Sequence, residues 1–223
     1  MIEEDRKVEN LVQPLLILGT NTFAVEVADL VSEIPGFRVT AFVENMQIER
    51  CQETLEDLPI LWVDKLAELS HSHLVVCGLT TTFRSRFTEQ AATYGIKFAT
   101  LIHPSARVSS KSSLGEGSIV SAGVIISSHT HLGRHVILNR GALVGHHTEI
   151  GDYTSIQPGA NVAGLCHIGD ATHIGMGAVV IDRITIGSHS IVGAGAVVTR
   201  DVPDNVQVVG VPARIVKENI KGK

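Results

Sequence analysis

Histidine is the side chain in this sequence with the clearest capacity for chemistry. The 223 residues include eleven histidines, nine of them after residue 100, and two are adjacent at His146 and His147. Because imidazole titrates near neutral pH, it can accept or donate a proton during a reaction, and it can also bind zinc. A zinc pair of His146 and His147 is disfavoured, since neighbouring residues of a strand point to opposite sides. We therefore expect proton transfer and no metal.

Other residue types exclude several classes of protein. The cysteines Cys51, Cys77 and Cys166 are odd in number and widely separated, which predicts neither disulfides nor a Cys-based zinc site and favours a reducing, cytoplasmic location. The net charge of −5 is not typical of a protein that binds nucleic acid through general positive charge. The sequence contains no run of about eighteen apolar residues, so we expect no membrane-spanning segment. The first ten residues are charged and lack an apolar segment, so we do not expect a secretory signal.

A six-residue repeat must position most of these histidines. Every sixth residue from Ile102 to Val198 is Ile, Leu or Val, and we call these residues the anchors. The residue two before an anchor is mostly Ser, Thr, Ala or Cys. Since alternate residues of a strand share a face, both rows point into one narrow interior. Hexads cannot bury their apolar faces singly, so they must stack into a parallel β-helix, with three hexads per coil.

Composition supports this division of the chain. Hydrophobic residues make up 44% of the sequence but aromatic residues only 4%, and eight of the nine aromatics lie at or before Phe98. A narrow prism would exclude rings from its interior. His146 is distinctive within the repeat, because it is the single histidine at the second position after an anchor.

The first hundred residues predict a small α/β region. Short apolar runs alternate with helical patterns, which is typical of a parallel sheet. We expect strands at 15–19, 39–43, 74–78 and 97–101, and helical segments at 24–34, 64–69 and 83–94. The turn after the first strand keeps one glycine, Gly19, so an ordinary dinucleotide loop is not expected. Glu44 ends the second strand, where it could bind a ribose hydroxyl or simply be solvated.

The layout resembles the sugar O/N-acyltransferases of the NeuD/PglD type, over roughly residues 14 to 217. The most specific pieces are FATLIHPSA at 98–106, ILNRGALVGH at 137–146, IGMGAVV at 174–180 and VGVPA at 209–213. The resemblance implies a Rossmann-like nucleotide-sugar-binding domain at 14–101, a left-handed β-helix at 102–200, a charged tail at 1–13 and an extension at 201–223. It also implies transfer of an acetyl group from acetyl-CoA to an amine or hydroxyl of a nucleotide-linked amino sugar, in surface glycan biosynthesis, by a homotrimer.

The same resemblance assigns roles to individual residues. It places the general base on His146, with His147 and Asn139 as further catalytic positions. Acetyl-CoA contacts fall on Ser155, Gly164, Met176 and Ala194, for which ordinary coil packing is the alternative interpretation. Nucleotide-sugar contacts fall on Gly19, Asn21, Thr22, Phe23, Glu44, Asn45 and Gly78.

Three positions depart from the family pattern. In the family, an acidic residue usually follows the catalytic histidine and orients its ring. Here the following residue is His147, and we expect that it cannot take this role. Glu149, Asp152 or a residue from another subunit is the expected substitute. A family histidine near the thioester end of acetyl-CoA corresponds to Ser155. The glycine- and histidine-rich sugar loop is replaced by Asn21-Thr22-Phe23.

Two other functions are compatible with parts of the sequence. A carbonic-anhydrase-like zinc enzyme would use His131 and His167, which lie two coils apart, but its expected third ligand is Thr172. A non-catalytic nucleotide-sugar-binding or scaffold relative would explain His147 and the altered loop. Turnover with acetyl-CoA and metal content distinguish these hypotheses.

Overall fold

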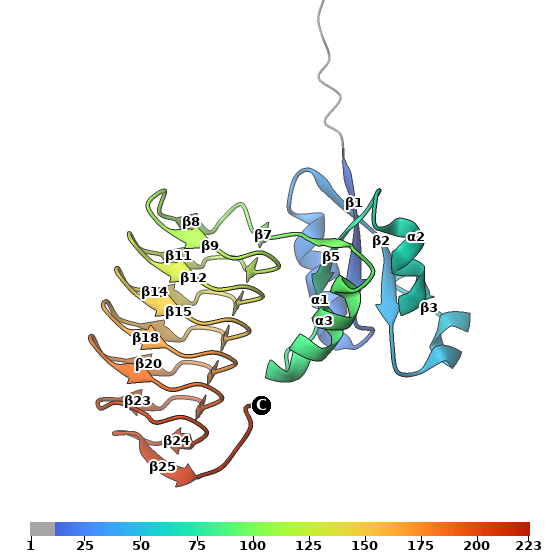
Figure 1. Cartoon of the computed structure of the whole chain (residues 1–223). Helices are drawn as coiled ribbons and strands as arrows, with labels where there is room; N and C mark the ends of the chain where they lie inside the picture. Colours follow the sequence, from blue (N-terminus) through green and yellow to red (C-terminus); the bar gives the residue numbers. More distant parts are fainter. Residues whose placement is uncertain (1–11) are drawn as a thin grey trace, which may run out of the picture.

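The computed structural model describes residues 12–223, so residues 1–11 of the predicted tail 1–13 lie outside the described residues. An α/β region and a long stack of coils lie side by side (Figure 1). The end of the chain returns from the bottom of the stack to the α/β region, where the carbonyl of Lys223 accepts a hydrogen bond from the Thr82 amide at 2.7 Å.

The α/β region is built on one sheet with the strand order β3-β4-β2-β1-β5-β6, parallel except for the β3–β4 hairpin. Its strands are β1 (Gln13–Leu18), β2 (Phe37–Glu44), β3 (Thr54–Leu55), β4 (Leu58–Trp62), β5 (Leu74–Cys77) and β6 (Lys97–Phe98). Its helices are α1 (Thr22–Ser32), α2 (Leu66–Leu69) and α3 (Ser85–Ala92), with 3-10 turns η1 (Ile48–Gln52), η2 (Val63–Lys65) and η3 (Thr82–Arg84).

Both faces of this sheet are covered, which explains the continuous apolar run of β1. Leu15 and Ile17 pack in the cluster that includes α1, while Leu16 and Leu18 pack in the cluster that includes α3. The predicted strands and helices are present with small shifts at their ends, except that the strand predicted at 97–101 is divided: β6 (Lys97–Phe98) ends the α/β sheet and Leu101 already belongs to the first strand of the β-helix. β4 was missed because Pro59 interrupts its pattern; it lies near the edge of the sheet, where proline is tolerated.

The repeat forms a parallel β-helix, as predicted. From β7 (Leu101–Ile102) to β23 (Val197–Val198), each paired strand lies eighteen residues from its partner, so three hexads make one coil. Sheet I contains β7 (Leu101–Ile102), β10 (Ile119–Val120), β13 (Ile137–Leu138), β16 (Ser155–Ile156), β19 (His173–Ile174), β22 (Ile191–Val192), β24 (Gln207–Val209) and β25 (Arg214–Lys217). Sheet II contains β8 (Arg107–Val108), β11 (Ile125–Ile126), β14 (Leu143–Val144), β17 (Asn161–Val162), β20 (Val179–Val180) and β23 (Val197–Val198). Sheet III contains β9 (Ser113–Leu114), β12 (His131–Leu132), β15 (Glu149–Ile150), β18 (His167–Ile168) and β21 (Thr185–Ile186).

The two inward rows of the repeat fill the prism. From Val120 onward the anchors are buried, whereas Ile102, at the open upper end, is 40% exposed. The small polar residues beneath the anchors are buried too, and they bond to the next coil; Thr154 Oγ1, for example, donates to the Gly169 carbonyl at 2.7 Å. Short side chains therefore keep the interior narrow and connect successive coils.

The lower end of the stack differs from the predicted boundary at residue 200. β24 pairs in parallel with β22 and so extends sheet I by one more strand. β25 then turns back and pairs antiparallel with β24 at the bottom of the stack (Figure 1). The chain after residue 200 is thus partly β-helix and partly a terminal cap.

Candidate functional site

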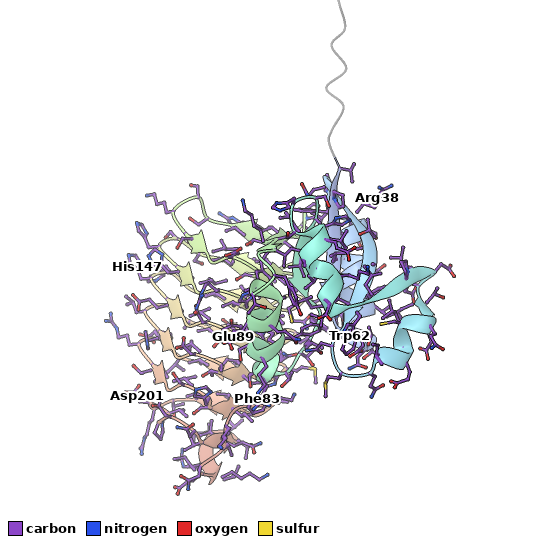
Figure 2. All side chains as sticks on the ribbon, turned by 45° about the vertical axis from the view of Figure 1, so that its right-hand side comes forward. Arg38, Trp62, Phe83, Glu89, His147 and Asp201 are labelled. Carbon is purple, nitrogen blue, oxygen red and sulfur yellow. The ribbon has the colours of Figure 1, made fainter. Side chains whose placement is uncertain are left out.

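The three edges of the prism carry different side chains. The Asn139 edge joins sheet I to sheet II, the His146 edge joins sheet II to sheet III, and the Tyr153 edge joins sheet III to sheet I. The α/β region packs on sheet I, where Leu101, Ile119 and Ile137 belong to the same apolar cluster as α1. The His146 edge faces away from the α/β region, as the position of His147 shows (Figure 2).

His146 lies over the backbone of the following coil. Its ring atoms Cε1 and Nε2 are 2.9 Å from where a Cβ atom on Gly164 would be placed, so Gly164 leaves the space that the imidazole fills. Both His146 and His147 are exposed in the single chain. The Nε2 side of the ring is thus supported from below while the residue remains reachable for a substrate.

His147 contacts His146 directly, which we did not predict. Their Nδ1 atoms are 3.1 Å apart and their rings meet edge to face at 86°. The backbone of His147 is left-handed, with φ 54°, and this corner turns its side chain onto His129 of the preceding coil. Those two rings stack with centroids 4.7 Å apart.

The acidic residues expected to replace the family carboxylate are engaged elsewhere. Glu149 lies on sheet III, with Oε2 3.2 Å from Nδ1 of His167. Asp152 lies on the Tyr153 edge and binds the Arg134 guanidinium at 2.7 Å. Burial opposes ionisation of Asp152, but hydrogen bonds from the Arg134 amide and side chain lower its pKa overall. Within one chain, neither carboxylate serves His146.

Asn139 and His146 do not meet within one chain. Asn139 directly follows β13, whereas His146 follows β14, so the strand of sheet II separates the two edges. The Asn139 side chain is almost fully buried, and its Oδ1 accepts a hydrogen bond from the Arg140 amide at 2.8 Å. Any joint site needs a second chain that brings the two edges together.

The four positions assigned to acetyl-CoA separate into three places. Met176 and Ala194 lie one coil apart on the Asn139 edge and line one cavity of about 400 Å³, together with Gln157, His173 and Lys223. Gly164 lies under His146 on the other edge. Ser155 has no exposed surface, and its hydroxyl accepts a hydrogen bond from Arg84 at 3.0 Å. Ser155 could contact a ligand only after rearrangement of this bond.

Four of the residues assigned to the nucleotide sugar lie together where the parallel strands end. Gly19, Asn21, Glu44 and Asn45 line a cavity of about 130 Å³. Gly19 has φ 106° and faces Leu79, so the turn after β1 requires glycine. The other three assigned residues lie around this turn but do not line the cavity. Thr22 and Phe23 begin α1, and Gly78 packs against Ala24, where a Cβ atom would approach within 2.8 Å.

Glu44 supports the cavity wall and is already fully bonded. Its Oε2 accepts from the Thr20 hydroxyl at 2.6 Å, and its Oε1 accepts from the amides of Asn45 and Met46. Burial raises the pKa of Glu44, but these hydrogen bonds outweigh it and hold the pKa below its usual value. The carboxylate therefore fixes the loop after β2, which favours the structural interpretation over ribose binding.

Two functional candidates near this cavity were missed from the sequence. Thr20 is buried beside Glu44, and the Arg50 guanidinium donates to the Thr20 carbonyl at 3.2 Å. Arg50 follows β2 by several residues within a polar segment, where no motif marks it. The helix α1 starts beside this cation, and its N-cap residue Asn21 makes no side-chain capping bond.

Sheets II and III present opposite chemistry on their outer faces. Outward residues of sheet II below the first coil form a mainly aliphatic row that is partly exposed, Ile125, Leu143, Asn161, Val179 and Val197, with Arg107 at its upper end. Outward residues of sheet III form a polar row: Ser113, His131, Glu149, His167 and Thr185. Sheet II is thus the apolar face that the α/β region leaves uncovered.

The zinc hypothesis gains no support from the described part of the chain. Between residues 12 and 223, no three His, Cys, Asp or Glu side chains are grouped so that they could hold a metal ion. His131 and His167 lie on sheet III, where Glu149 separates them, while Thr172 is buried beneath sheet I. None of the helices described is long and apolar enough to cross a membrane.

Comparisons with known proteins agree with this architecture. The family model of bacterial transferase hexapeptide (six repeats) matches residues 165–200. No curated protein sequence matches the chain. Among solved structures, a histidine-to-asparagine variant of perosamine N-acetyltransferase from Caulobacter crescentus, in complex with CoA and GDP-perosamine, is 31% identical with a TM-score of 0.86, and the match covers 93% of this chain and 98% of that one.

Two further solved structures are similar over nearly the whole chain. The acetyltransferase domain of PglB from Neisseria gonorrhoeae, in complex with acetyl coenzyme A, is 30% identical with a TM-score of 0.85, covering 92% of this chain and 99% of that one. WeeI from Acinetobacter baumannii is 29% identical with a TM-score of 0.82, covering 92% and 100%.

Proposed function

The chain belongs to the hexapeptide-repeat sugar N-acetyltransferases, and from this we propose that it transfers an acetyl group from acetyl-CoA to the amine of a nucleotide-linked amino sugar. The observation that carries the proposal is His146, an exposed imidazole supported over Gly164 at an edge of the β-helix. The α/β region is then a Rossmann-like module for the nucleotide sugar, and the coils wind in a left-handed sense.

In this reaction the sugar amine attacks the thioester carbonyl of acetyl-CoA. A bond forms between nitrogen and the acyl carbon, the bond from that carbon to sulfur breaks, and CoA leaves as a thiolate that takes up a proton. Nε2 of His146 accepts the proton that the amine loses, since imidazole can do so without being permanently charged. Backbone N–H groups at a corner of the coil can stabilise the oxyanion.

The apolar face of sheet II supports a homotrimer. A cyclic assembly around sheet II buries the aliphatic row of Leu143 and Val179 and places the Asn139 edge of one chain beside the His146 edge of the next. The acetyl-CoA positions Met176 and Ala194 would then face the partner's Gly164 across one groove. Because these residues lie apart within a single chain, the complete acetyl-CoA site would require the assembly.

The cavity at the end of the parallel strands suits the diphosphate of the acceptor. The N-terminal end of α1 offers amides that a helix leaves unpaired, and the Arg50 guanidinium adds a positive charge beside them. Glu44 and Thr20 hold this wall in place. The acceptor amine would extend from here toward the edge that carries Asn139.

The test incubates the purified protein with acetyl-CoA and a panel of GDP- and UDP-linked amino sugars, and follows free thiol. We expect turnover with at least one acceptor, and a loss of about 100- to 10,000-fold in kcat for His146→Ala. His189→Ala is the matched control, because His189 occupies a left-handed corner on a different edge. Unchanged turnover in His146→Ala would refute the role of His146, and no thiol release with any acceptor would favour a non-catalytic relative.

A further inference from the structure

Three histidines meet at the His146 edge, and only one of them has a role in the proposed reaction. His147 contacts His146 through the Nδ1 atoms at 3.1 Å, and His129 stacks on His147 at 4.7 Å with an angle of 15° between the rings. His129 and His147 occupy the same corner of successive coils and have φ values of 57° and 54°. The repeat therefore places the side chains of His129 and His147 one above the other, in what we call the histidine column.

The Nδ1–Nδ1 contact restricts the protons of the pair. Two nitrogens at hydrogen-bond distance need one proton between them, because two protons or two lone pairs would repel. If Nε2 of His146 is the base, it carries no proton before the reaction, so the proton lies on Nδ1 of His146. Nδ1 of His147 must then be the acceptor, and the remaining proton of neutral His147 is on its Nε2.

His129 explains why the His147 ring holds this orientation. The side chain of His147 is exposed, so it would otherwise rotate and present either Nε2 or Nδ1 to its neighbour. A parallel stack fixes the plane of the ring without using either nitrogen as a donor or acceptor, and within that plane the contact with His146 selects Nδ1 over the ring carbon Cδ2. Leu165, the residue at the same corner in the following coil, has no comparable ring.

We propose that neutral His147, held by stacking on His129, accepts the Nδ1 proton of His146 and so keeps its Nε2 free to act as the base. His129 is thereby a positioning residue that acts through His147. This inference rests on the proposed function in taking His146 as the base. It replaces the expectation that the residue after the base cannot orient it.

Nitrogen-15 NMR of histidine side chains tests the proton positions independently of turnover. At a pH where the rings are neutral, we expect Nδ1 of His147 to be unprotonated and Nδ1 of His146 to be protonated. In His129→Ala we expect His147 to lose this single tautomer and show a mixture. A protonated Nδ1 on His147, or an unchanged tautomer in His129→Ala, would overturn the proposal.

Kinetics then test the positioning role. His129→Ala should lower kcat about tenfold with the KM for acetyl-CoA changed by less than about twofold, because a misplaced base slows the chemical step. His129→Phe keeps a flat ring for the stack and should stay within about twofold of the parent protein. The exposed His189→Ala serves as the control, because His189 is outside the histidine column.

A double variant distinguishes an action through His147 from a general loss of structure. His147→Glu supplies a carboxylate acceptor that does not depend on a stack, so it should preserve or raise activity. Adding His129→Ala to it should then cause no further loss. A further tenfold loss in the double variant would refute the proposal. An inactive parent protein with the expected NMR tautomers would instead refute the proposed function and leave this proton arrangement standing.

Discussion

At the scale of single residues, the candidate site depends on space as much as on functional groups. His146 carries the chemistry, but Gly164 allows its ring to lie over the following coil. Gly164 would therefore be needed for catalysis even if its backbone never touched acetyl-CoA. The two residues, eighteen apart, illustrate how the coil turns a sequence spacing into a contact.

Gly164→Ala should separate activity from stability. The added Cβ would come within 2.9 Å of the imidazole, and the imidazole, as the far end of a flexible side chain, can move away. We expect kcat to fall about 100-fold while the melting temperature changes little, because a small displacement of a base is costly for catalysis. Steady-state kinetics and thermal unfolding measure both quantities. In a His146→Ala background the change should cost no further activity; a further loss would point to a direct role of Gly164.

Glu44 should make stability depend on pH in a defined direction. Its hydrogen bonds lower the folded-state pKa below the ordinary 4.5, so the stabilisation is complete above pH 4.5 and is lost as pH falls through the folded-state value. Glu44→Gln should remove this part of the acid dependence. Urea unfolding between about pH 3 and pH 7 measures the effect. Glu49→Gln, an exposed neighbour, is the control, and identical curves for Glu44→Gln and the parent protein would contradict the assignment.

At the scale of elements, one buried arginine connects the α/β region to the β-helix. Arg84, at the end of η3, is 1% exposed and donates to the carbonyls of His135 and Tyr153, each at 2.7 Å. Burial lowers its pKa to about 10, which still leaves it charged at neutral pH. Backbone carbonyl groups at the Tyr153 edge thus accept the hydrogen bonds of this buried guanidinium, a role that a carboxylate often has.

Replacing Arg84 should loosen this connection. Arg84→Met leaves several buried carbonyls without donors, and we expect it to reduce the free energy of unfolding by about 2–4 kcal/mol. Arg86→Met is the matched control in the adjacent turn, because Arg86 is exposed and lies 5.7 Å above the Phe83 ring; it should cost about 0.5 kcal/mol or less. Chemical denaturation compares the two. Equal effects would show that Arg84 does not connect the two parts.

The sequence allowed the elements to be predicted better than their contacts. Anchors at every sixth residue determine the β-helix, since stacking the coils buries the anchors from Val120 onward. The partners of Arg84 in the β-helix lie 51 to 71 residues away, beyond any local pattern. The stack of His129 on His147 could have been inferred from the eighteen-residue coil, because both occupy the same corner. The assignment of Glu149 or Asp152 to His146 overlooked that they belong to another sheet and another edge.

At the scale of the whole molecule, the three faces of the prism have three different uses. The α/β region covers the upper strands of sheet I, sheet III is polar, and sheet II exposes its aliphatic row. The proposed assembly around sheet II explains why Asn139 and His146 lie on its two borders. The complete site is then a property of neighbouring chains.

A charge on sheet II should abolish both assembly and activity. In Leu143→Glu, a carboxylate would be buried near its copies around the symmetry axis, so we expect monomers. Activity should fall to background even though His146 and Asn139 are unchanged. Thr185→Glu, on the polar face of sheet III, should remain assembled and active. Light scattering after gel filtration and the thiol assay measure both, and a fully active monomer would refute a shared site.

A stack that repeats by translation has no internal reason to end, because the last parallel strand of each sheet offers the same unpaired backbone groups as the one before it. In this chain β25 (Arg214–Lys217) runs in the opposite direction across the final strand of sheet I. A second molecule approaching from below would meet this reversed strand and could not continue the parallel register. The reversal therefore closes the lower edge of sheet I to the parallel addition of another coil.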